Sequence, residues 1–208
     1  MNENKIEALI FDLGGVLLDW NPEYLYAKIF ENDREKMNWF LQNICTSDWN
    51  MEQDAGRSFK EGTDFLVDQY PEYETSIRAF YVRWNEMLKE EIKGSVLILN
   101  KLKALNKVKL YALTNWSVET FPIAEARFPC LKLFQGIVVS GMVNTRKPFP
   151  EIYRILLNRY HLEAEKCLFI DDNQDNVNTA RQLGMVAIHF KSPDQLNQEL
   201  VQLGILEQ

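Results

Sequence analysis

Five short runs of apolar residues occur along the chain, one near its start and four after residue 108. They are almost continuously apolar and do not alternate with polar residues, which is typical of strands buried on both faces of a parallel sheet. Other stretches repeat apolar residues every three or four positions, as amphipathic helices do. The expected strands are 6–12, 109–115, 136–140, 166–172 and 185–190, and the expected helices are 96–105, 118–128, 150–160, 176–184 and 192–204. Gly184 and Gly204 stand where glycine commonly ends a helix.

The alternation of strands and helices predicts an α/β fold with right-handed crossovers. The segment from residue 19 to residue 88 breaks this alternation, because no strand-like run is found in it. Helical spacing there predicts helices at 22–30, 34–45, 57–70 and 73–88. An insertion after the first strand would lie over the edge where open α/β sheets bind ligands. We therefore expect a core domain of residues 1–18 and 89–208 and an inserted helical cap domain of residues 19–88.

Composition and charge narrow the classes of protein. The 208 residues are 46% hydrophobic and 25% charged, which is globular, and a net charge of −7 argues against general binding of nucleic acid. No apolar run approaches the roughly 20 residues of a membrane helix, and no secretory signal is recognisable. We expect no membrane association and a cytoplasmic location. Cys45, Cys130 and Cys167 are too scattered for a disulfide framework or a zinc site.

Polar residues follow four of the five expected strands. They are Asp12, Thr114 with Asn115, Lys147, and Asp171 with Asp172. In a parallel sheet these strand ends meet at one edge, so the side chains are expected to lie together. Carboxylates suit Mg²⁺, a hydroxyl and a lysine suit a phosphoryl group, and an aspartate can act as a nucleophile. Taken alone, Asp12 is typical of a turn or a helix cap, Thr114 with Asn115 of a cap, Lys147 of a solvated loop, and Asp171 with Asp172 of a turn. The joint pattern favours a catalytic site.

Four motifs in order resemble the haloacid dehalogenase superfamily, in the subgroup with a helical cap after the first strand. They are FDLGGVL at 11–17, LTN at 113–115, RKPFPEIY at 146–153 and FIDDNQDNV at 169–177. A branch that includes α-glucose-1-phosphate phosphatase-like members is similar in having DLG after the first strand. The resemblance covers the core from residue 6 to about residue 190 and implies a Rossmann-like parallel sheet.

The resemblance also implies roles for individual residues. Asp12 corresponds to the nucleophile, and Thr114 and Lys147 correspond to groups that bind and stabilise the phosphoryl group. Mg²⁺ would be held by Asp12, the main-chain oxygen of residue 14 (Gly14) and Asp172, with Asp171 beside it and Asn176 at the far acidic position of the last motif. The implied function is a Mg²⁺-dependent phosphatase that forms an aspartyl phosphate. The expected partner is a small phosphorylated metabolite, with a sugar phosphate as one candidate, and both a monomer and a homodimer stay open.

Gly14 departs from the family pattern, in which the residue two after the nucleophile is an aspartate acting as acid and base. Such a group is commonly worth about 10²–10⁴ in rate. The substrate could have a leaving group that needs little protonation, a cap residue or an ordered water could substitute, or the protein could be nearly inactive. A metal-free 2-haloacid dehalogenase and a non-catalytic protein that binds phosphometabolites are the alternative functions, although the Asp171–Asp172 pair favours the phosphatase. Gly14 and Gly15 are expected to permit a sharp turn.

Several aromatic and polar residues are candidates for substrate recognition. Trp20 and Asn21 lie at the entrance to the expected cap, and Trp116 follows Thr114 and Asn115. Trp49 beside Arg57 would suit a stacked sugar and a second anion. Most of the five tryptophans are nevertheless expected to pack the cap, since each aromatic ring buries a large area. His161 and His189 follow apolar patterns without evident partners, and no role is assigned to them.

Overall fold

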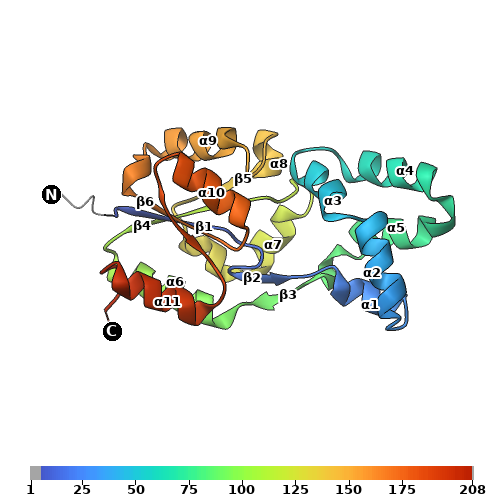
Figure 1. Ribbon diagram of the computed structural model, residues 1–208, viewed down its shortest axis with the longest axis horizontal. Coiled ribbons are helices and arrows are strands. Elements are labelled where there is room, and N and C mark those ends of the chain that lie inside the picture. The colour runs from blue at the N-terminus through green and yellow to red at the C-terminus, as the bar shows by residue number, and fades with distance from the viewer. Residues whose placement is uncertain (1–5, 208) are drawn as a thin grey trace.

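The computed structural model describes residues 6–207 and contains a five-stranded sheet (Figure 1). The strand order is β5-β4-β1-β6-β7, and every neighbouring pair is parallel. The strands are β1 (Ala8–Phe11), β4 (Lys109–Thr114), β5 (Gly136–Val139), β6 (Cys167–Asp171) and β7 (Val186–His189). Each lies within the range expected from the sequence, so the α/β class and the parallel sheet are confirmed.

Helices cover both faces of this sheet, which explains why its strands are apolar at nearly every position. Successive residues of β1 face opposite layers: Leu9 and Phe11 belong to one buried cluster, and Ala8 and Ile10 belong to the other. The first layer contains α6 (Lys93–Leu105), α7 (Phe121–Arg127) and α11 (Pro193–Gln202). The second contains α8 (Ser140–Val143), α9 (Pro150–Tyr160) and α10 (Gln174–Gln182). Gly184 and Gly204 follow α10 and α11 with positive φ, as expected.

Five more helices are inserted between the core strands and gather at one end of the molecule (Figure 1). They are α1 (Glu23–Ile29), α2 (Arg34–Asn43), α3 (Ser47–Asp54), α4 (Phe59–Gln69) and α5 (Glu74–Val82). The sequence predicted four of them but missed α3, whose two apolar residues, Trp49 and Met51, do not have helical spacing. The Thr46 side chain accepts a hydrogen bond from the main-chain N–H of Trp49 and so begins this helix.

Two short antiparallel strands connect the core to these helices. β2 (Leu18–Trp20) pairs with β3 (Leu88–Glu91), with Leu18 opposite Glu91 and Trp20 opposite Leu88. The prediction that no strand occurs from residue 19 to residue 88 is therefore wrong, because strands of three and four residues show too few positions for a pattern. The division into a core domain (1–18 and 89–208) and a cap domain (19–88) stays a prediction.

Short 3₁₀ segments complete the described chain. They are η1 (Pro71–Tyr73), η2 (Trp84–Glu86), η3 (Pro129–Leu133) and η4 (Ala164–Lys166). η2 replaces the last turns of the helix expected at 73–88. Within residues 6–207, no helix has the length and apolar character needed to cross a lipid bilayer.

Candidate active site

Three carboxylates from two neighbouring strands meet at the carboxyl edge of the sheet. Asp12 follows β1, whereas Asp171 ends β6 and Asp172 follows it. The two strands pair in register, so these residues lie at the same level of the sheet. One carboxylate oxygen from each of the three residues lies within 4.8 Å of the others. The structure thus brings together acidic residues that are about 160 positions apart in the sequence.

Lys147 reaches this cluster from the loop after α8. Its Nζ lies 2.8 Å from Asp12 Oδ1 and 2.7 Å from Asp171 Oδ2, and its side chain is only 1% exposed. Asn115 holds the lysine main chain from both sides: it accepts a hydrogen bond from Lys147 N (2.8 Å) and donates one to Lys147 O (3.0 Å). Asn115 therefore positions the lysine, a function that its place in the sequence did not reveal.

The two adjacent aspartates have different environments. Asp171 is fully buried, and its Oδ1 accepts hydrogen bonds from Asn173 N (2.8 Å) and Asn176 Nδ2 (2.9 Å) while Oδ2 holds Lys147. Asp172 is exposed, and its main-chain oxygen lies 2.9 Å from His189 Nε2. The expectation that His189 lacks a partner is therefore wrong. Asp171 acts as a fixed anchor inside the cluster, and Asp172 presents its carboxylate to solvent.

The cluster contains more negative than positive charge. Burial raises the pKa of Asp12 to about 7; Lys147 opposes this shift, while Asp171 and Asp172 add to it. Burial also raises the pKa of Asp172. Burial alone would lower the pKa of Lys147, but the two nearby carboxylates outweigh it and raise that pKa. Three carboxylates facing one lysine leave a place that favours a further cation.

The two glycines after Asp12 serve different purposes. Gly15 has φ +72°, and a Cβ there would collide with the carboxylate of Asp172. Gly14 has no such φ, and a Cβ there would meet nothing within 4 Å. The expectation that glycine permits a sharp turn is confirmed for Gly15, whereas the backbone of Gly14 has no conformation that favours glycine. The space beside Gly14 is open and has the room for a side chain.

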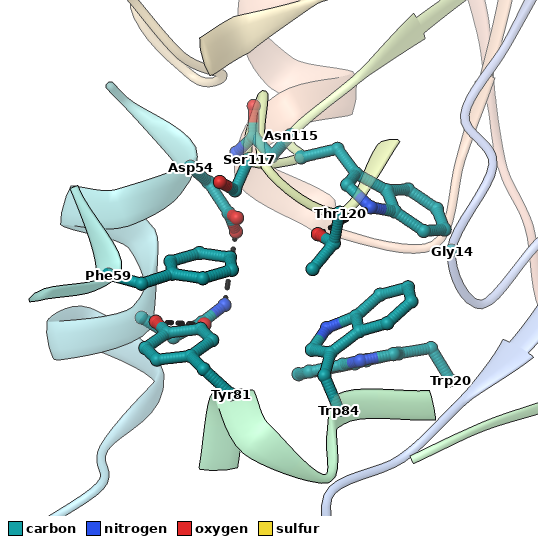
Figure 2. Close-up of a pocket in the computed structure, with 11 residues that line it drawn as sticks. Gly14, Trp20, Asp54, Phe59, Tyr81, Trp84, Asn115, Ser117 and Thr120 are labelled. Carbon is teal, nitrogen blue, oxygen red and sulfur yellow. Dashed lines mark hydrogen bonds between the residues drawn. The ribbon is translucent and has the colours of Figure 1, made fainter. Parts of the chain in front are cut away.

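A pocket adjoins the carboxylate cluster, and Figure 2 shows its walls. Gly14 and Asn115 line it, and they belong to the loops that follow β1 and β4. Its empty space, counted with its open mouth, is about 450 Å³. Its aromatic lining consists of Trp20, Phe59, Tyr81, Trp84 and Trp116, and its polar lining also includes Asn50, Asp54, Ser117 and Thr120. The pocket thus lies between the sheet edge and the inserted helices.

Some predicted binding residues line this pocket and others do not. Trp20, Trp116 and Asn115 line it, and Thr114 is buried at the end of β4. Asn21 lies at the start of α1, where its Oδ1 accepts a hydrogen bond from Glu23 N (2.9 Å).

Trp49 and Arg57 serve packing within the inserted helices. Trp49 is buried and donates from Nε1 to Gly62 O (2.9 Å). Arg57 donates from Nε to Gln53 Oε1 (2.5 Å) and from Nη2 to Trp49 O (3.3 Å), which ties its guanidinium to α3. The reading of Trp49 as a packing residue fits this environment, and the suggestion that Arg57 holds a second anion gains no support from it.

Sequence reasoning missed five lining residues from the insertion: Asn50, Asp54, Phe59, Tyr81 and Trp84. Trp84 falls at an apolar position of an expected helix and so resembled a packing residue. Asp54 ends α3, the helix that the hydrophobic pattern did not predict. A cap residue that replaces the missing acid at Gly14 was one of the alternatives considered, but no pattern in the sequence distinguishes such a residue.

Three curated proteins match most of this chain. The sesquiterpene phosphatase astK of Aspergillus oryzae is 28% identical over 198 residues, which cover 95% of this chain and 96% of that protein. The phosphorylated carbohydrates phosphatase of Thermotoga maritima is 28% identical over 193 residues, covering 88% of this chain and 84% of that protein. The drimenol cyclase drtB of Aspergillus calidoustus is 26% identical over 199 residues, which span 95% of this chain but only 36% of the cyclase.

A solved structure shares the fold of this chain, and a family model identifies its family. A haloacid dehalogenase family enzyme from Bacteroides thetaiotaomicron, solved with magnesium and inorganic phosphate, superposes with a TM-score of 0.67 at 24% identity, covering 90% of this chain and 95% of that one. At this identity the likeness shows the fold alone. The family model for haloacid dehalogenase-like hydrolases matches residues 6–184, a span that contains all four sequence motifs. This chain therefore belongs to the haloacid dehalogenase-like hydrolase family.

Proposed function

We propose that this protein is a Mg²⁺-dependent phosphatase that hydrolyses the phosphate monoester of a small metabolite through an aspartyl phosphate on Asp12. The observation that carries the proposal is the contact of the buried Lys147 ammonium with Asp12 (2.8 Å) inside a three-carboxylate cluster. A carboxylate nucleophile, a fixed cation and a place for a second cation suit phosphoryl transfer through an aspartyl phosphate. The phosphatase names of two relatives support the same reaction.

Asp12 is oriented for attack by contacts on one of its oxygens. Leu13 N donates a hydrogen bond to Oδ1 (2.7 Å), and Lys147 Nζ lies 2.8 Å from the same atom. We assign Oδ2 as the atom that attacks phosphorus. Because burial raises the pKa of Asp12 to about 7, a cation beside it favours the ionised form that the reaction needs.

The acidic residues fit a magnesium site. Asp12 and Asp172 would hold the ion together with the main-chain oxygen of Gly14, since oxygen ligands suit this hard cation. Asp171 completes the cluster, but its oxygens already accept hydrogen bonds from Asn173, Asn176 and Lys147, so its main task is to fix the lysine. When bound, Mg²⁺ supplies positive charge that offsets the charge developing on the phosphoryl oxygens.

Thr114 and Lys147 bind the phosphoryl group at the sheet edge. Thr114 ends β4, beside β1, and its hydroxyl suits a phosphoryl oxygen. Asp12 and Asp171 keep the buried ammonium of Lys147 protonated, so it can stabilise the same charge. Asp12 attacks phosphorus, the ester P–O bond breaks, and water then releases inorganic phosphate from Asp12.

The organic part of the substrate lies in the adjoining pocket. Five aromatic rings and a few polar groups line that pocket, so its occupant needs an extensive apolar face. Both a sugar ring, through its C–H face, and an isoprenoid chain have one. The relatives named for carbohydrate and sesquiterpene phosphates are consistent with either class. The proposed partner is therefore a small phosphorylated metabolite.

The test is phosphate release from 4-nitrophenyl phosphate, glucose 1-phosphate and farnesyl phosphate, each with Mg²⁺ and with excess EDTA. The proposal expects Mg²⁺-dependent turnover of at least one ester and its loss in Asp12→Asn. Activity that persists in EDTA or in Asp12→Asn would contradict it. Metal-free release of chloride from 2-chloropropionate would instead favour the dehalogenase, and thermal stabilisation by these esters without turnover would favour a binding protein.

A further inference from the structure

The pocket contains one carboxylic acid among the described residues that line it, and this is Asp54. Asp54 is the last residue of α3 and comes from the inserted helices, not from the sheet. Figure 2 shows its carboxylate and Gly14 on opposite sides of the pocket. The organic part of the proposed substrate would lie between them. Asp54 and Gly14 therefore both border the space that the leaving group of the proposed substrate would occupy.

Three contacts fix Asp54 relative to the core. Ser140 Oγ, at the start of α8, donates a hydrogen bond to the main-chain oxygen of Asp54, and it accepts one from Trp116 N (2.8 Å). Arg146, next to Lys147 in the sequence, lies 3.6 Å from Glu52 and 3.7 Å from the Met51 sulfur, both on α3. The end of α3 is therefore attached to Trp116 through Ser140 and to the loop that carries Lys147 through Arg146.

The carboxylate of Asp54 is held mainly by neutral groups. Its Oδ2 accepts a hydrogen bond from Asn50 Nδ2 (3.1 Å), and Tyr81 OH in turn donates to Asn50 Oδ1 (3.1 Å). Burial raises the pKa of Asp54 to about 7, although the main-chain N–H of Ser117 and the charge of Arg146 oppose the shift. Near neutral pH this carboxyl is available in both its protonated and its ionised form, as an acid–base catalyst requires.

Gly14 supplies the complementary observation. It stands where the resemblance places an aspartate, and a Cβ there would meet nothing within 4 Å. The core therefore leaves this position open without any steric need for glycine. Asp54 and Gly14 line the same pocket, so the carboxyl group of Asp54 can replace the one that is absent at residue 14.

We propose that Asp54 is the general acid and base of this active site and supplies from the helical insertion the group that Gly14 lacks. This inference rests on the proposed phosphatase function. As Asp12 Oδ2 bonds to phosphorus, the P–O bond to the organic group breaks, and the leaving oxygen keeps that electron pair and takes the proton of Asp54. The Asp54 carboxylate then removes a proton from water, whose oxygen bonds to phosphorus while the P–O bond to Asp12 breaks and returns its electrons to Asp12. The products are an alcohol and inorganic phosphate, and Asp54 is protonated again.

The test compares two esters that differ in their need for a proton. 4-Nitrophenolate leaves unassisted, whereas the alkoxide of benzyl phosphate must be protonated. We expect Asp54→Asn to lower kcat/KM for benzyl phosphate by about 10²–10⁴ and for 4-nitrophenyl phosphate by less than about tenfold. The latter activity shows that the variant folds. In Asp54→Asn the hydrolysis of the aspartyl phosphate lacks its base and becomes slow. With 4-nitrophenyl phosphate this variant is therefore expected to release one nitrophenol per enzyme in a rapid burst before the slow steady state.

Two further variants complete the experiment. Adding Gly14→Asp to Asp54→Asn is expected to raise kcat/KM for benzyl phosphate at least tenfold above that of Asp54→Asn alone, because the space at residue 14 is open. Asp48→Asn, an exposed carboxylate in the first turn of the same helix, is the matched control and is expected to react like wild type with both esters. Equal losses on both esters in Asp54→Asn, or a wild-type rate with benzyl phosphate, would overturn the assignment of Asp54. Failure of the wild type with both esters in Mg²⁺ would overturn the phosphatase function, and this inference with it.

Discussion

Replacing Lys147 with methionine removes the positive charge that lies between Asp12 and Asp171. Methionine keeps most of the length of the side chain and its apolar stem, so packing changes little. The lysine side chain is 1% exposed and the Asp171 side chain 0%, so water cannot solvate the charge left behind. We therefore expect the protein to be destabilised as well as inactive.

The expected loss follows from the cost of breaking a buried ion pair. Removing one partner of such a pair typically costs about 3–5 kcal/mol, and here two carboxylates lose the same cation, at 2.8 Å and 2.7 Å. Without Lys147 the folded-state pKa of Asp12, which burial already raises, moves further above its unfolded value. The native variant then binds protons that the unfolded chain does not, so the loss of stability is largest near pH 8 and shrinks toward pH 5.

The assay is urea unfolding at pH 8 and at pH 5, in EDTA so that no metal supplies the missing charge. Lys166→Met is the matched control, since Lys166 also contacts two carboxylates, Glu7 at 3.4 Å and Glu163 at 3.0 Å, but its side chain is 34% exposed. We expect no measurable change for this control. A Lys147→Met protein as stable as wild type at pH 8, or one that loses equal stability at both pH values, would refute the reasoning.

Three further predictions concern the neighbouring residues. Gly15→Ala is expected to displace Asp172 and to weaken Mg²⁺ binding, measured by calorimetry, at least tenfold, whereas Gly14→Ala is expected to bind Mg²⁺ as wild type does. The raised pKa of Asp54 means that the wild type loses stability as pH rises from about 4 to about 7, and Asp54→Asn lacks this loss. The full shift corresponds to about 4 kcal/mol, which we reduce to about 1–2 kcal/mol because the pocket is open to solvent. Relative to wild type, Asp54→Asn should therefore be about 1–2 kcal/mol more stable at pH 8 than it is at pH 4. Urea midpoints that shift equally at both pH values would contradict this. Ser140→Ala removes the hydrogen-bond donor to the main-chain oxygen of Asp54. In steady-state assays it should lower kcat/KM for benzyl phosphate but not for 4-nitrophenyl phosphate.

The sheet could be predicted from the sequence because burial on both faces leaves a simple signal. Runs such as Ala8–Phe11 are apolar throughout, and the polar residues after four of the five runs mark the edge of the sheet where the candidate site lies. Asp12, Lys147 and Asp171 could be placed in one site on that basis alone. Their mutual contacts follow from the parallel register, which the alternation of strands and helices already implies.

The walls of the pocket could not be predicted in the same way. α3 contains Trp49 and Met51 two positions apart, so it has no helical stripe, and its first turn depends on a cap from Thr46. Asp54 is therefore an ordinary acidic residue in the sequence and becomes distinctive only through its place in the pocket. The pairing of Asn115 with the main chain of Lys147 likewise depends on two loops that are 32 residues apart.

The central claim is that Asp12 carries the phosphoryl group between the two steps. The most direct measurement is mass spectrometry of Asp54→Asn quenched in acid during turnover of 4-nitrophenyl phosphate with Mg²⁺. The account predicts a phosphoryl group on the peptide that contains Asp12, present in this slowly hydrolysing variant and absent after addition of EDTA before the substrate. An unmodified Asp12 peptide during rapid, Mg²⁺-dependent release of nitrophenol would contradict it.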